Sequence, residues 1–517
     1  MKKTTLHLHS RFVVDVVDPR IFGGFLEHLG RAVYEGVYEP TSKHADEHGC
    51  RTDVLEALRR LRFTAMRYPG GNFVSGYHWQ DAVGPRSSRP QTLDLAWQSI
   101  ETNQFGPNEF LELSQRMDWT PMMAVNLGTG TPEEGRNWIE YCNNTAGTKY
   151  ADLRIEHGYE KPFDVKLWCL GNEMDGPWQI GHVPAETYAI NAQQTARMMK
   201  MVDPKIELVV CGSCAIHLPT YLEWDRKVLE HCKDDVEFIS VHRYVENPEH
   251  DTENFLAVTN SIDQQIEAMD SVCASVHHTK KTKRKVAISF DEWNVWYRTR
   301  RNRADRTLPG WPVAPPILEE VYTMADALAF GGACIALLNH ADRVKVACLA
   351  QLVNVIAPIM TEDGGPAWRQ TIFYPFAQMS HFGRGDVLRA EIDSPAYDAT
   401  CYDPRGEQDL YFPVTAPYLK LAAVRDRNDG VTLFALNRHL SEPMPMTVAM
   451  SGFNAQSVRA ARTLHHPDLN ATNTRDSPDM VRPAALEGAS VAGGTMRATL
   501  PPASWNVIRL GLAAPSA

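Results

Sequence analysis

The sequence has few cysteines and no long apolar run, and these absences exclude two large classes of protein. Ten cysteines are spread over 517 residues, too sparsely for a disulfide scaffold, so we expect reduced thiols. No segment approaches the roughly 18 uninterrupted apolar residues of a transmembrane helix. At the N-terminus, His7, His9 and Arg11 interrupt the apolar stretch that a secretory signal requires. The sequence therefore predicts a soluble, cytoplasmic protein without a membrane partner.

Basic charge is also scarce. The chain has 52 lysines and arginines against 63 acidic residues, which gives a net charge of -11. Nucleic acids and anionic membranes bind basic surfaces, so neither is an expected partner. Cys211 and Cys214 have the spacing of a metal or redox site, but no second C-x-x-C pair accompanies them. We therefore expect neither a metal nor a cofactor.

The larger, N-terminal part of the chain has the pattern of a parallel barrel. From about residue 18 to residue 380, short apolar runs alternate with helical patterns such as residues 255–276. Eight runs are candidate strands: residues 21–25, 64–68, 121–126, 164–170, 206–210, 236–242, 285–290 and 333–338. Eight β-α units can close a parallel sheet, so we predict a (β/α)8 TIM barrel over residues 18–380.

The rest of the sequence has a different pattern. After about residue 382, short alternating runs such as residues 418–424 are separated by turn residues. This alternation favours an antiparallel β-sandwich of the jelly-roll type over residues 381–517. The opening segment, residues 1–17, also alternates, and we expect it to add a strand to this second domain.

Polar side chains closely follow seven of the eight predicted strands. Alone, each is an ordinary loop residue, but in a parallel barrel the carboxyl ends of all strands meet at one mouth. We therefore expect a single site built from these side chains. In chain order they are Glu27, Arg67 with Asn72, Asn126, Asn172 with Glu173, His242 with Tyr244, Glu292, and Asn339 with His340.

Two of these residues, Glu173 and Glu292, have the chemistry that acetal hydrolysis requires. One carboxyl group must protonate the departing oxygen, and a second carboxylate must stabilise or attack the anomeric carbon. A separation of about 5 to 5.5 Å would make the enzyme retaining, and about 6.5 to 9.5 Å would make it inverting. The sequence leaves this distance open. Taken singly, either glutamate is more commonly a helix cap or an ion-paired loop residue.

The neighbouring residues suggest which glutamate has which role. Arg67 and Tyr244 can hydrogen-bond Glu292 and keep it ionised, as a nucleophile requires. Glu173 follows Trp168 and precedes Met174 and Trp178. We expect desolvation by these side chains to favour the neutral acid.

Several motifs strongly resemble the family 51 glycoside hydrolases, chiefly α-L-arabinofuranosidases, almost end to end. They are FGGFLEH (22–28), RYPGGNF (67–73), WCLGNE (168–173), HRY (242–244), FDEWNVWY (290–297) and LAQLVNVIAPI (349–359). The resemblance implies that Glu173 is the acid/base and Glu292 the nucleophile of an exo-acting, retaining enzyme. It also implies arabinose-containing oligosaccharides as substrates and a homo-oligomer, with a hexamer as one option. The implied sugar contacts are Glu27, Asn72, Asn172, Tyr244 and Gln351, with Trp296 as a pocket wall.

Physical chemistry leaves some of these roles open. Asn172 can bond the sugar 2-hydroxyl, and Glu27 and Gln351 are suited to more distant hydroxyls. Glu27 could instead pair with an arginine, and Gln351 could bond buried backbone. Spacing alone allows Trp296 to be a core residue, and His242 could orient a partner or act directly.

Three other functions compete with this interpretation. A metal-dependent barrel hydrolase would use histidines, but the sequence offers His28, His242 and His340 only singly. A noncatalytic carbohydrate-binding protein would not need both glutamates. The same glutamates could also serve a β-xylosidase or β-glucanase.

Five arginines lie within residues 298–306. Such a run predicts a solvated or interface surface. It would affect substrate preference if the arginines bordered the leaving group.

Overall fold

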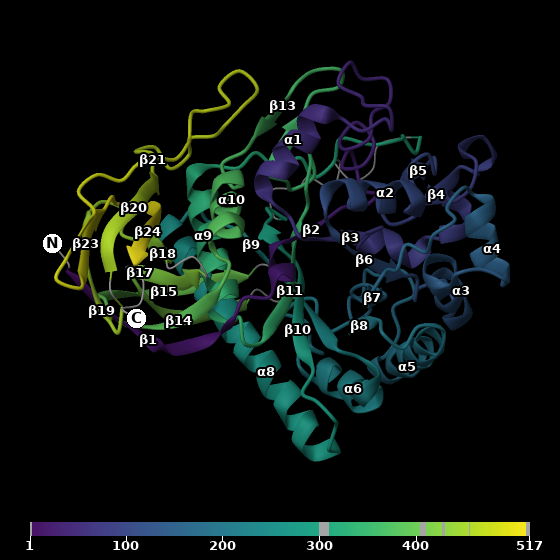
Figure 1. Ribbon diagram of the computed structural model, residues 1–517, viewed down its shortest axis with the longest axis horizontal. Helices are drawn as coiled ribbons and strands as arrows, with labels where there is room; N and C mark the ends of the chain where they lie inside the picture. The colour runs from purple at the N-terminus through teal and green to yellow at the C-terminus, as the bar shows by residue number, and fades with distance from the viewer. Residues whose placement is uncertain (1–2, 299–309, 404–409, 427–429, 454, 513–517) are drawn as a thin grey trace.

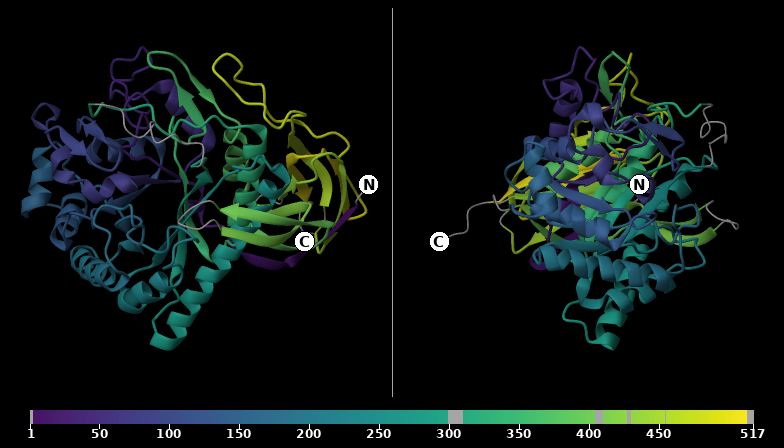
Figure 2. Two further views of the ribbon diagram at one scale, coloured as in Figure 1. Left: turned by 180° about the vertical axis from the view of Figure 1, so that it is seen from behind. Right: turned by 90° about the vertical axis from the view of Figure 1, so that its right-hand side faces the viewer.

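The computed structural model describes residues 3–298, 310–403, 410–426, 430–453 and 455–512 (Figure 1). Except for Arg298, the arginine-rich segment lies outside the described residues. Figures 1 and 2 place a barrel surrounded by helices beside a separate β-sheet region. The predicted boundary between the two near residue 380 stays a prediction.

Eight parallel strands form a closed barrel, which confirms the predicted (β/α)8 fold. They are β2 (Gly23–Phe25), β3 (Ala65–Tyr68), β6 (Thr120–Val125), β7 (Leu167–Leu170), β8 (Glu207–Val210), β9 (Phe238–Val245), β10 (Ala287–Val295) and β11 (Val344–Ala350). β11 closes the barrel because it pairs with β10 on one side and with β2 on the other.

The eighth strand was placed wrongly from the sequence. Residues 333–338 belong to helix α9 (Met324–Asn339), and the strand is β11, further along the chain. α9 lies between the barrel and the second sheet and is buried nearly all round, so its sequence lacks the polar face that normally reveals a helix. Asn339 and His340 therefore lie at the end of α9 and contact Leu421 and Asp263. Gln351, by contrast, directly follows β11.

The other helices surround the barrel (Figure 1). They are α1 (Thr52–Leu61), α2 (Pro107–Met117), α3 (Pro132–Asn143), α4 (Lys149–Glu156), α5 (Ala185–Val202), α6 (Glu223–Cys232), α7 (Thr252–Ala257), α8 (Asn260–Lys280) and α10 (Phe373–Phe382). The helix predicted over residues 255–276 is thus broken between α7 and α8. At the break, the Thr259 carbonyl accepts from Lys420 and its hydroxyl from Arg438, each at 2.9 Å.

Short hairpins extend the loops at the barrel mouth. β4 (Thr92–Asp94) pairs with β5 (Ser99–Glu101), and β12 (Ile359–Thr361) pairs with β13 (Ala367–Arg369). A third hairpin joins β15 (Ala396–Asp403) to β16 (Leu410–Pro417). The short 3-10 helices are η1 (Pro19–Phe22), η2 (Asn72–Gly76), η3 (Trp79–Ala82), η4 (Arg86–Ser88) and η5 (Lys233–Asp235). None of the helices in the described residues is long and apolar enough to cross a bilayer.

The second region is a ten-stranded, mainly antiparallel sheet, as the sequence predicted. In spatial order its strands are β21 (Ala484–Ala485), β20 (Ala455–Leu464), β24 (Ser504–Leu512), β18 (Gly430–Asn437), β17 (Leu419–Asp426), β14 (Asp386–Asp393), β1 (Thr4–Val16), β19 (Met444–Ser451), β23 (Thr495–Leu500) and β22 (Ser490–Ala492). β1 joins this sheet, antiparallel to β14 and parallel to β19. Leu6, Leu433, Met496 and Ile508 share one buried cluster, so strands far apart in the sheet enclose a common core.

Helix α9 packs closely against the second sheet. A Cβ atom on Gly331 would lie 2.5 Å from Cε3 of Trp505 in β24. The Trp505 indole is fully buried and donates from Nε1 to Oε1 of Gln378 in α10 at 2.7 Å. The helix can approach the indole this closely because Gly331 has no side chain.

We expect Gly331→Ala to lower the free energy of unfolding by about 1 kcal/mol or more, measured by denaturant unfolding. Overpacking costs about 1–3 kcal/mol, and a contact as short as 2.5 Å to a fixed indole should lie in the upper part of this range, which exceeds the ~1 kcal/mol that alanine gains over glycine in a helix. Gly135→Ala in α3 is the matched control, because its nearest neighbour is a Thr195 methyl group at 3.1 Å that can shift. Equal stability of the two variants would contradict this account.

Candidate active site

A cavity of about 370 Å³ opens among the loops that follow the barrel strands. Of the thirteen residues proposed for the site, Asn339 and His340 lie at the end of α9, and Asn126 does not line the cavity but donates to the Tyr77 carbonyl and to Thr129. Of the remaining ten, seven line the cavity: Glu27, Asn72, Glu173, Tyr244, Glu292, Trp296 and Gln351. The other three, Arg67, Asn172 and His242, are buried and bond the lining residues. The fold therefore brings all ten into one connected group.

Glu292, on β10, is held by one side chain on each carboxylate oxygen. Arg67 from β3 donates from Nη1 to Oε1 at 2.6 Å, and the Tyr244 hydroxyl from β9 donates to Oε2 at 2.9 Å. Arg67 also donates from Nη2 to Oδ1 of Asn172 at 2.6 Å. One buried guanidinium thus fixes a residue of β10 and a residue that follows β7.

Glu173 lies in the tight turn after β7, with a φ of 44°. This left-handed conformation is uncommon for a residue with a side chain and is typical of functional sites. Its Oε1 lies 2.9 Å from Nδ1 of His242, and its Oε2 accepts from Nε1 of Trp178 at 2.8 Å. A carboxylate oxygen of Glu173 lies within 4.8 Å of one of Glu292. Both carboxyl groups therefore face the same small volume.

His242 connects the two glutamates to Asp291. Nδ1 lies 2.9 Å from Glu173 and 3.5 Å from Glu292, and Nε2 lies 3.3 Å from Asp291 and 3.0 Å from Ser240. Burial alone would lower the pKa of His242, but the charge of Glu292 and hydrogen bonds to Asp291 and Glu173 raise it to about 10. The imidazole is therefore a cation at neutral pH.

A β-bulge lets neighbouring residues contact the same histidine. Alternation along a strand would place Asp291 and Glu292 on opposite faces, but the register of β10 with β9 shifts between Ser289 and Glu292. Burial raises the pKa of Asp291, but the Arg67 charge and the His242 hydrogen bond outweigh burial and lower it. Asp291 therefore stabilises the cation without lining the cavity.

The expected environment of Glu173 was partly wrong. Burial does raise its pKa, but hydrogen bonds from His242 and Trp178 and the His242 charge outweigh burial and lower it below the ordinary value. Trp168, expected beside this carboxyl group, does not line the cavity, and its ring packs edge-on against Trp138 of α3 at 5.6 Å. In the empty site the ionised form of Glu173 is thus favoured by its hydrogen bonds.

Glu27 and Gln351 both line the cavity and bond each other. Gln351 Nε2 donates to Glu27 Oε2 at 3.0 Å, and the Glu27 backbone N–H donates to Gln351 Oε1 at 3.1 Å. The other Glu27 oxygen accepts from the Phe73 backbone and from Nε1 of Trp97. Burial, and then the charge of Glu292, raise the pKa of Glu27 to about 8. Glu27 is thus hydrogen-bonded to neutral groups, not paired with an arginine, and is mostly protonated at neutral pH.

The remaining lining residues complete the walls. Asn172 Nδ2 lies 3.5 Å from Oδ1 of Asn72, and Trp296 packs edge-on against Tyr244 with ring centroids 4.9 Å apart. A Cβ atom on Gly71 would lie 3.0 Å from Glu27 and 3.2 Å from Glu292. Glycine at this position therefore leaves room between two carboxyl groups.

Comparisons with known proteins agree with this geometry. The family model described as "Alpha-L-arabinofuranosidase 1 domain" matches residues 57–264, and "Alpha-L-arabinofuranosidase C-terminal domain" matches residues 291–504. A Streptomyces lividans protein, named an intracellular exo-α-(1→5)-L-arabinofuranosidase, is 49% identical over 517 residues, covering 100% of this chain and 76% of that relative. A Bacillus subtilis protein with the same name and the suffix 1 is 46% identical over 99% of each chain.

A solved structure gives the family number. The structure of AbfB, a family 51 α-L-arabinofuranosidase from Bifidobacterium longum, superposes with a TM-score of 0.92 at 39% identity, covering 99% of this chain and 100% of that one. The chain belongs to glycoside hydrolase family 51. It is therefore an α-L-arabinofuranosidase, as its motifs predicted.

Sequence reasoning missed two contributors to the site of this family 51 enzyme. Trp97 lines the cavity and donates from Nε1 to Glu27 at 3.0 Å. It lies between β4 and β5, far from any strand end of the barrel, so its position in the sequence gave no signal. Asp291 directly precedes Glu292 in the sequence, and alternation along a strand gives no reason to expect both carboxylates beside one histidine.

We expect His242→Gln to shift the alkaline limb of the kcat/KM profile of this family 51 enzyme to higher pH. The variant removes the cation that lowers the pKa of Glu173, so Glu173 stays protonated to higher pH. In this variant the Glu173 carboxyl group is also no longer held in position by His242, which should reduce kcat by roughly 10²-fold. The control is His78→Gln, because the side chain of His78 is 47% exposed and pairs with Glu134. An unshifted alkaline limb in His242→Gln would show that His242 does not lower the pKa of Glu173.

Proposed function

We propose that this α-L-arabinofuranosidase is a retaining, exo-acting enzyme that works by double displacement, with Glu173 as acid/base and Glu292 as nucleophile. The observation that carries the proposal is that their carboxylate oxygens approach within 4.8 Å. This closeness fits the roughly 5 to 5.5 Å of retaining glycosidases better than the 6.5 to 9.5 Å of inverting ones. Inverting enzymes have the larger separation because a water must fit between the base and the sugar.

In the first step, a terminal arabinofuranosyl residue occupies the cavity with its anomeric carbon beside Glu292. An oxygen of Glu292 forms a bond to that carbon while the glycosidic C–O bond breaks, and Glu173 gives its proton to the departing oxygen. His242 Nδ1 lies 2.9 Å from Oε1 of Glu173 and holds this carboxyl group in position for the transfer. With Glu173 protonated, the charges of Arg67 and His242 balance those of Glu292 and Asp291.

In the second step, water replaces the sugar ester. Glu292 is neutralised as an ester, and Glu173, which became ionised when it gave up its proton in the first step, can act as base. It takes a proton from water, whose oxygen attacks the anomeric carbon and releases Glu292. Asn172, anchored by Arg67 at 2.6 Å, is suited to bond the sugar 2-hydroxyl and to stabilise the oxocarbenium-like transition state.

The lining contacts fit the binding of one terminal sugar. Glu27 and Gln351 line the cavity and bond each other at 3.0 Å, so both are placed to bond distal hydroxyls of the same sugar. Asn72, Tyr244 and Trp296 offer further lining contacts. Relatives named intracellular exo-α-(1→5)-L-arabinofuranosidases support (1→5)-linked arabino-oligosaccharides as substrates and a cytoplasmic location. The oligomeric state remains a prediction.

The nucleophile can be identified with azide. Glu292→Ala should lower kcat/KM for p-nitrophenyl α-L-arabinofuranoside by about 10⁴-fold or more, because no covalent intermediate forms. Azide should restore turnover and give a glycosyl azide of inverted configuration, identified by NMR. Glu173→Ala is the matched control: its intact nucleophile should yield an azide of retained configuration. Undiminished turnover by Glu292→Ala would remove this residue from the mechanism.

A metal-dependent mechanism is the second candidate, because one atom each of Glu173, His242 and Glu292 lie within 4.8 Å of one another. The histidines considered for this alternative have separate acidic partners: Glu101 for His28, Glu173 for His242 and Asp263 for His340. Arg67 and Tyr244 already donate to both Glu292 oxygens. The site thus has cationic and neutral donors where a metal would need open carboxylate oxygens.

A chelator distinguishes the two candidates. We expect full activity after prolonged dialysis against EDTA, because Arg67 and His242 supply the positive charge that a metal would otherwise provide. Activity is measured with the p-nitrophenyl substrate before and after dialysis. Loss of activity that is restored by one divalent cation would favour the metal-dependent alternative.

A further inference from the structure

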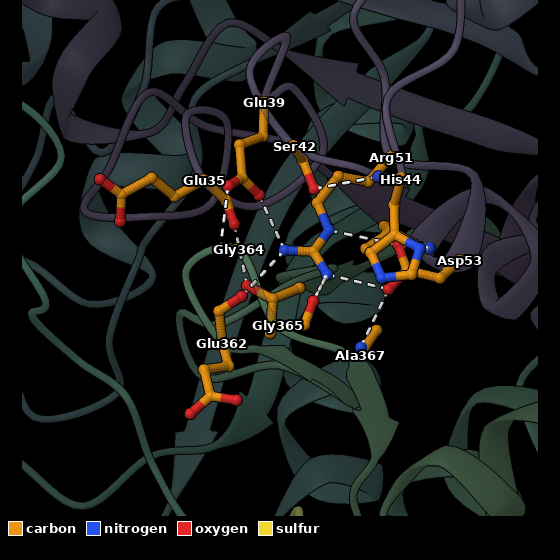
Figure 3. Close-up of polar contacts among 12 residues, drawn as sticks. Glu35, Glu39, Ser42, His44, Arg51, Asp53, Glu362, Gly364, Gly365 and Ala367 are labelled. Carbon is orange, nitrogen blue, oxygen red and sulfur yellow. Dashed lines mark hydrogen bonds and ion pairs between the residues drawn. The ribbon is translucent and has the colours of Figure 1, made fainter.

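A buried arginine joins two loops that do not themselves line the cavity at this point (Figure 3). The Arg51 side chain is 0% exposed, and five hydrogen bonds use its N–H groups. Its acceptors are Oδ1 and Oδ2 of Asp53 (3.2 and 2.8 Å), Oε2 of Glu39 (2.8 Å), and the carbonyls of Glu362 (3.1 Å) and Gly365 (2.6 Å). The guanidinium thus connects the segment after β2 to the turn between β12 and β13.

The two carboxylates that flank Arg51 also bond this turn. Glu39 Oε1 accepts from the Gly364 N–H at 3.2 Å, and Asp53 Oδ2 accepts from the Ala367 N–H at 2.9 Å. Burial raises the pKa of Asp53, but the Arg51 hydrogen bond and charge outweigh burial and lower it. The Asp53 carboxylate therefore helps to hold this turn, and its ionised form is stabilised by the Arg51 guanidinium.

Further contacts between the same two segments lead from Arg51 to the cavity. Thr361 Oγ1 donates to the Glu35 carbonyl at 2.8 Å, and Asn354 Nδ2 donates to the Arg31 carbonyl at 2.9 Å. The last contact in this series is the Glu27–Gln351 pair. One segment carries Glu27 and Arg51, and the other carries Gln351 and the β12–β13 turn.

We propose that Arg51 is a positioning residue that fixes the two loops at the spacing at which Glu27 and Gln351 bind the terminal sugar. Arg51, Glu39 and Asp53 do not line the cavity, so Arg51 acts through the loops and not by contact with substrate. The inference rests on the proposed sugar contacts of Glu27 and Gln351. Loss of the guanidinium leaves the catalytic glutamates in place and loosens the part of the cavity that binds the sugar.

The conservative variant Arg51→Lys tests this proposal, because an ammonium group keeps the charge but cannot reproduce a planar, five-donor fork. We expect KM for the p-nitrophenyl substrate and Ki for arabinose to rise by about tenfold, with kcat changed by less than about threefold. Such a split is expected when an interaction is lost equally from ground and transition states. Hydrogen exchange of the peptide covering residues 351–372 should become faster.

Arg154→Lys is the matched control. Arg154 is also 0% exposed and makes five hydrogen bonds, all to backbone carbonyls around α4: those of Tyr141, Asn144, Thr145, Tyr159 and Glu160. We expect both lysine variants to unfold at lower temperature but only Arg51→Lys to change KM and Ki. An unchanged KM in Arg51→Lys, or an equal rise in Arg154→Lys, would overturn the proposal.

Two further variants separate the role of Arg51 from the sugar contact on which it depends. If Arg51→Lys does not fold, Glu39→Gln keeps an oxygen for Gly364 but removes the charge facing Arg51, and a smaller rise in KM is expected; an unchanged KM would overturn the proposal. Gln351→Ala tests the underlying sugar contact directly. A normal KM in Gln351→Ala would disprove that contact, whereas a raised KM there with normal values in both loop variants would reject only the role of Arg51.

Discussion

Two glutamates can share one small cavity because two buried cations lie beside them. Two negative charges 4.8 Å apart would repel by roughly 3 kcal/mol at an effective dielectric constant near 20. Arg67 and His242 offset this repulsion by direct hydrogen bonds to Glu292 and Glu173. The arrangement requires β3, β7, β9 and β10 to converge at one mouth, and a closed parallel barrel brings these strand ends together.

The barrel supplies the charges, and the loops shape the cavity. Trp97 reaches Glu27 from the β4–β5 hairpin, and Gln351 reaches it from the end of β11. The segments that follow β2 and β11 are joined by a further series of hydrogen bonds, which ends at Arg51. The second sheet lies away from the cavity and covers α9, which explains why that helix is apolar on all sides.

Local pattern was sufficient for most of the fold. Seven of the eight predicted runs overlap barrel strands, because a buried parallel strand is a short apolar run bounded by polar residues. The same pattern failed at residues 333–338, since a helix buried between two layers has no polar face. The error displaced the last strand and assigned Asn339 and His340 to the mouth. Because of this error, the sequence did not reveal that Gln351 directly follows the last barrel strand.

By itself, the sequence determined the barrel, the second sheet with its N-terminal strand, and the two glutamates toward the carboxyl ends of strands four and seven of the barrel. These features depend on periodicity and on the order of residues, which are local properties of the chain. Only the tertiary structure decided the separation of the glutamates, the bulge that turns Asp291 toward His242, and the balance of burial and hydrogen bonding that sets the pKa of Glu173. Each of these depends on distances between side chains that are remote in sequence, and packing alone sets such distances.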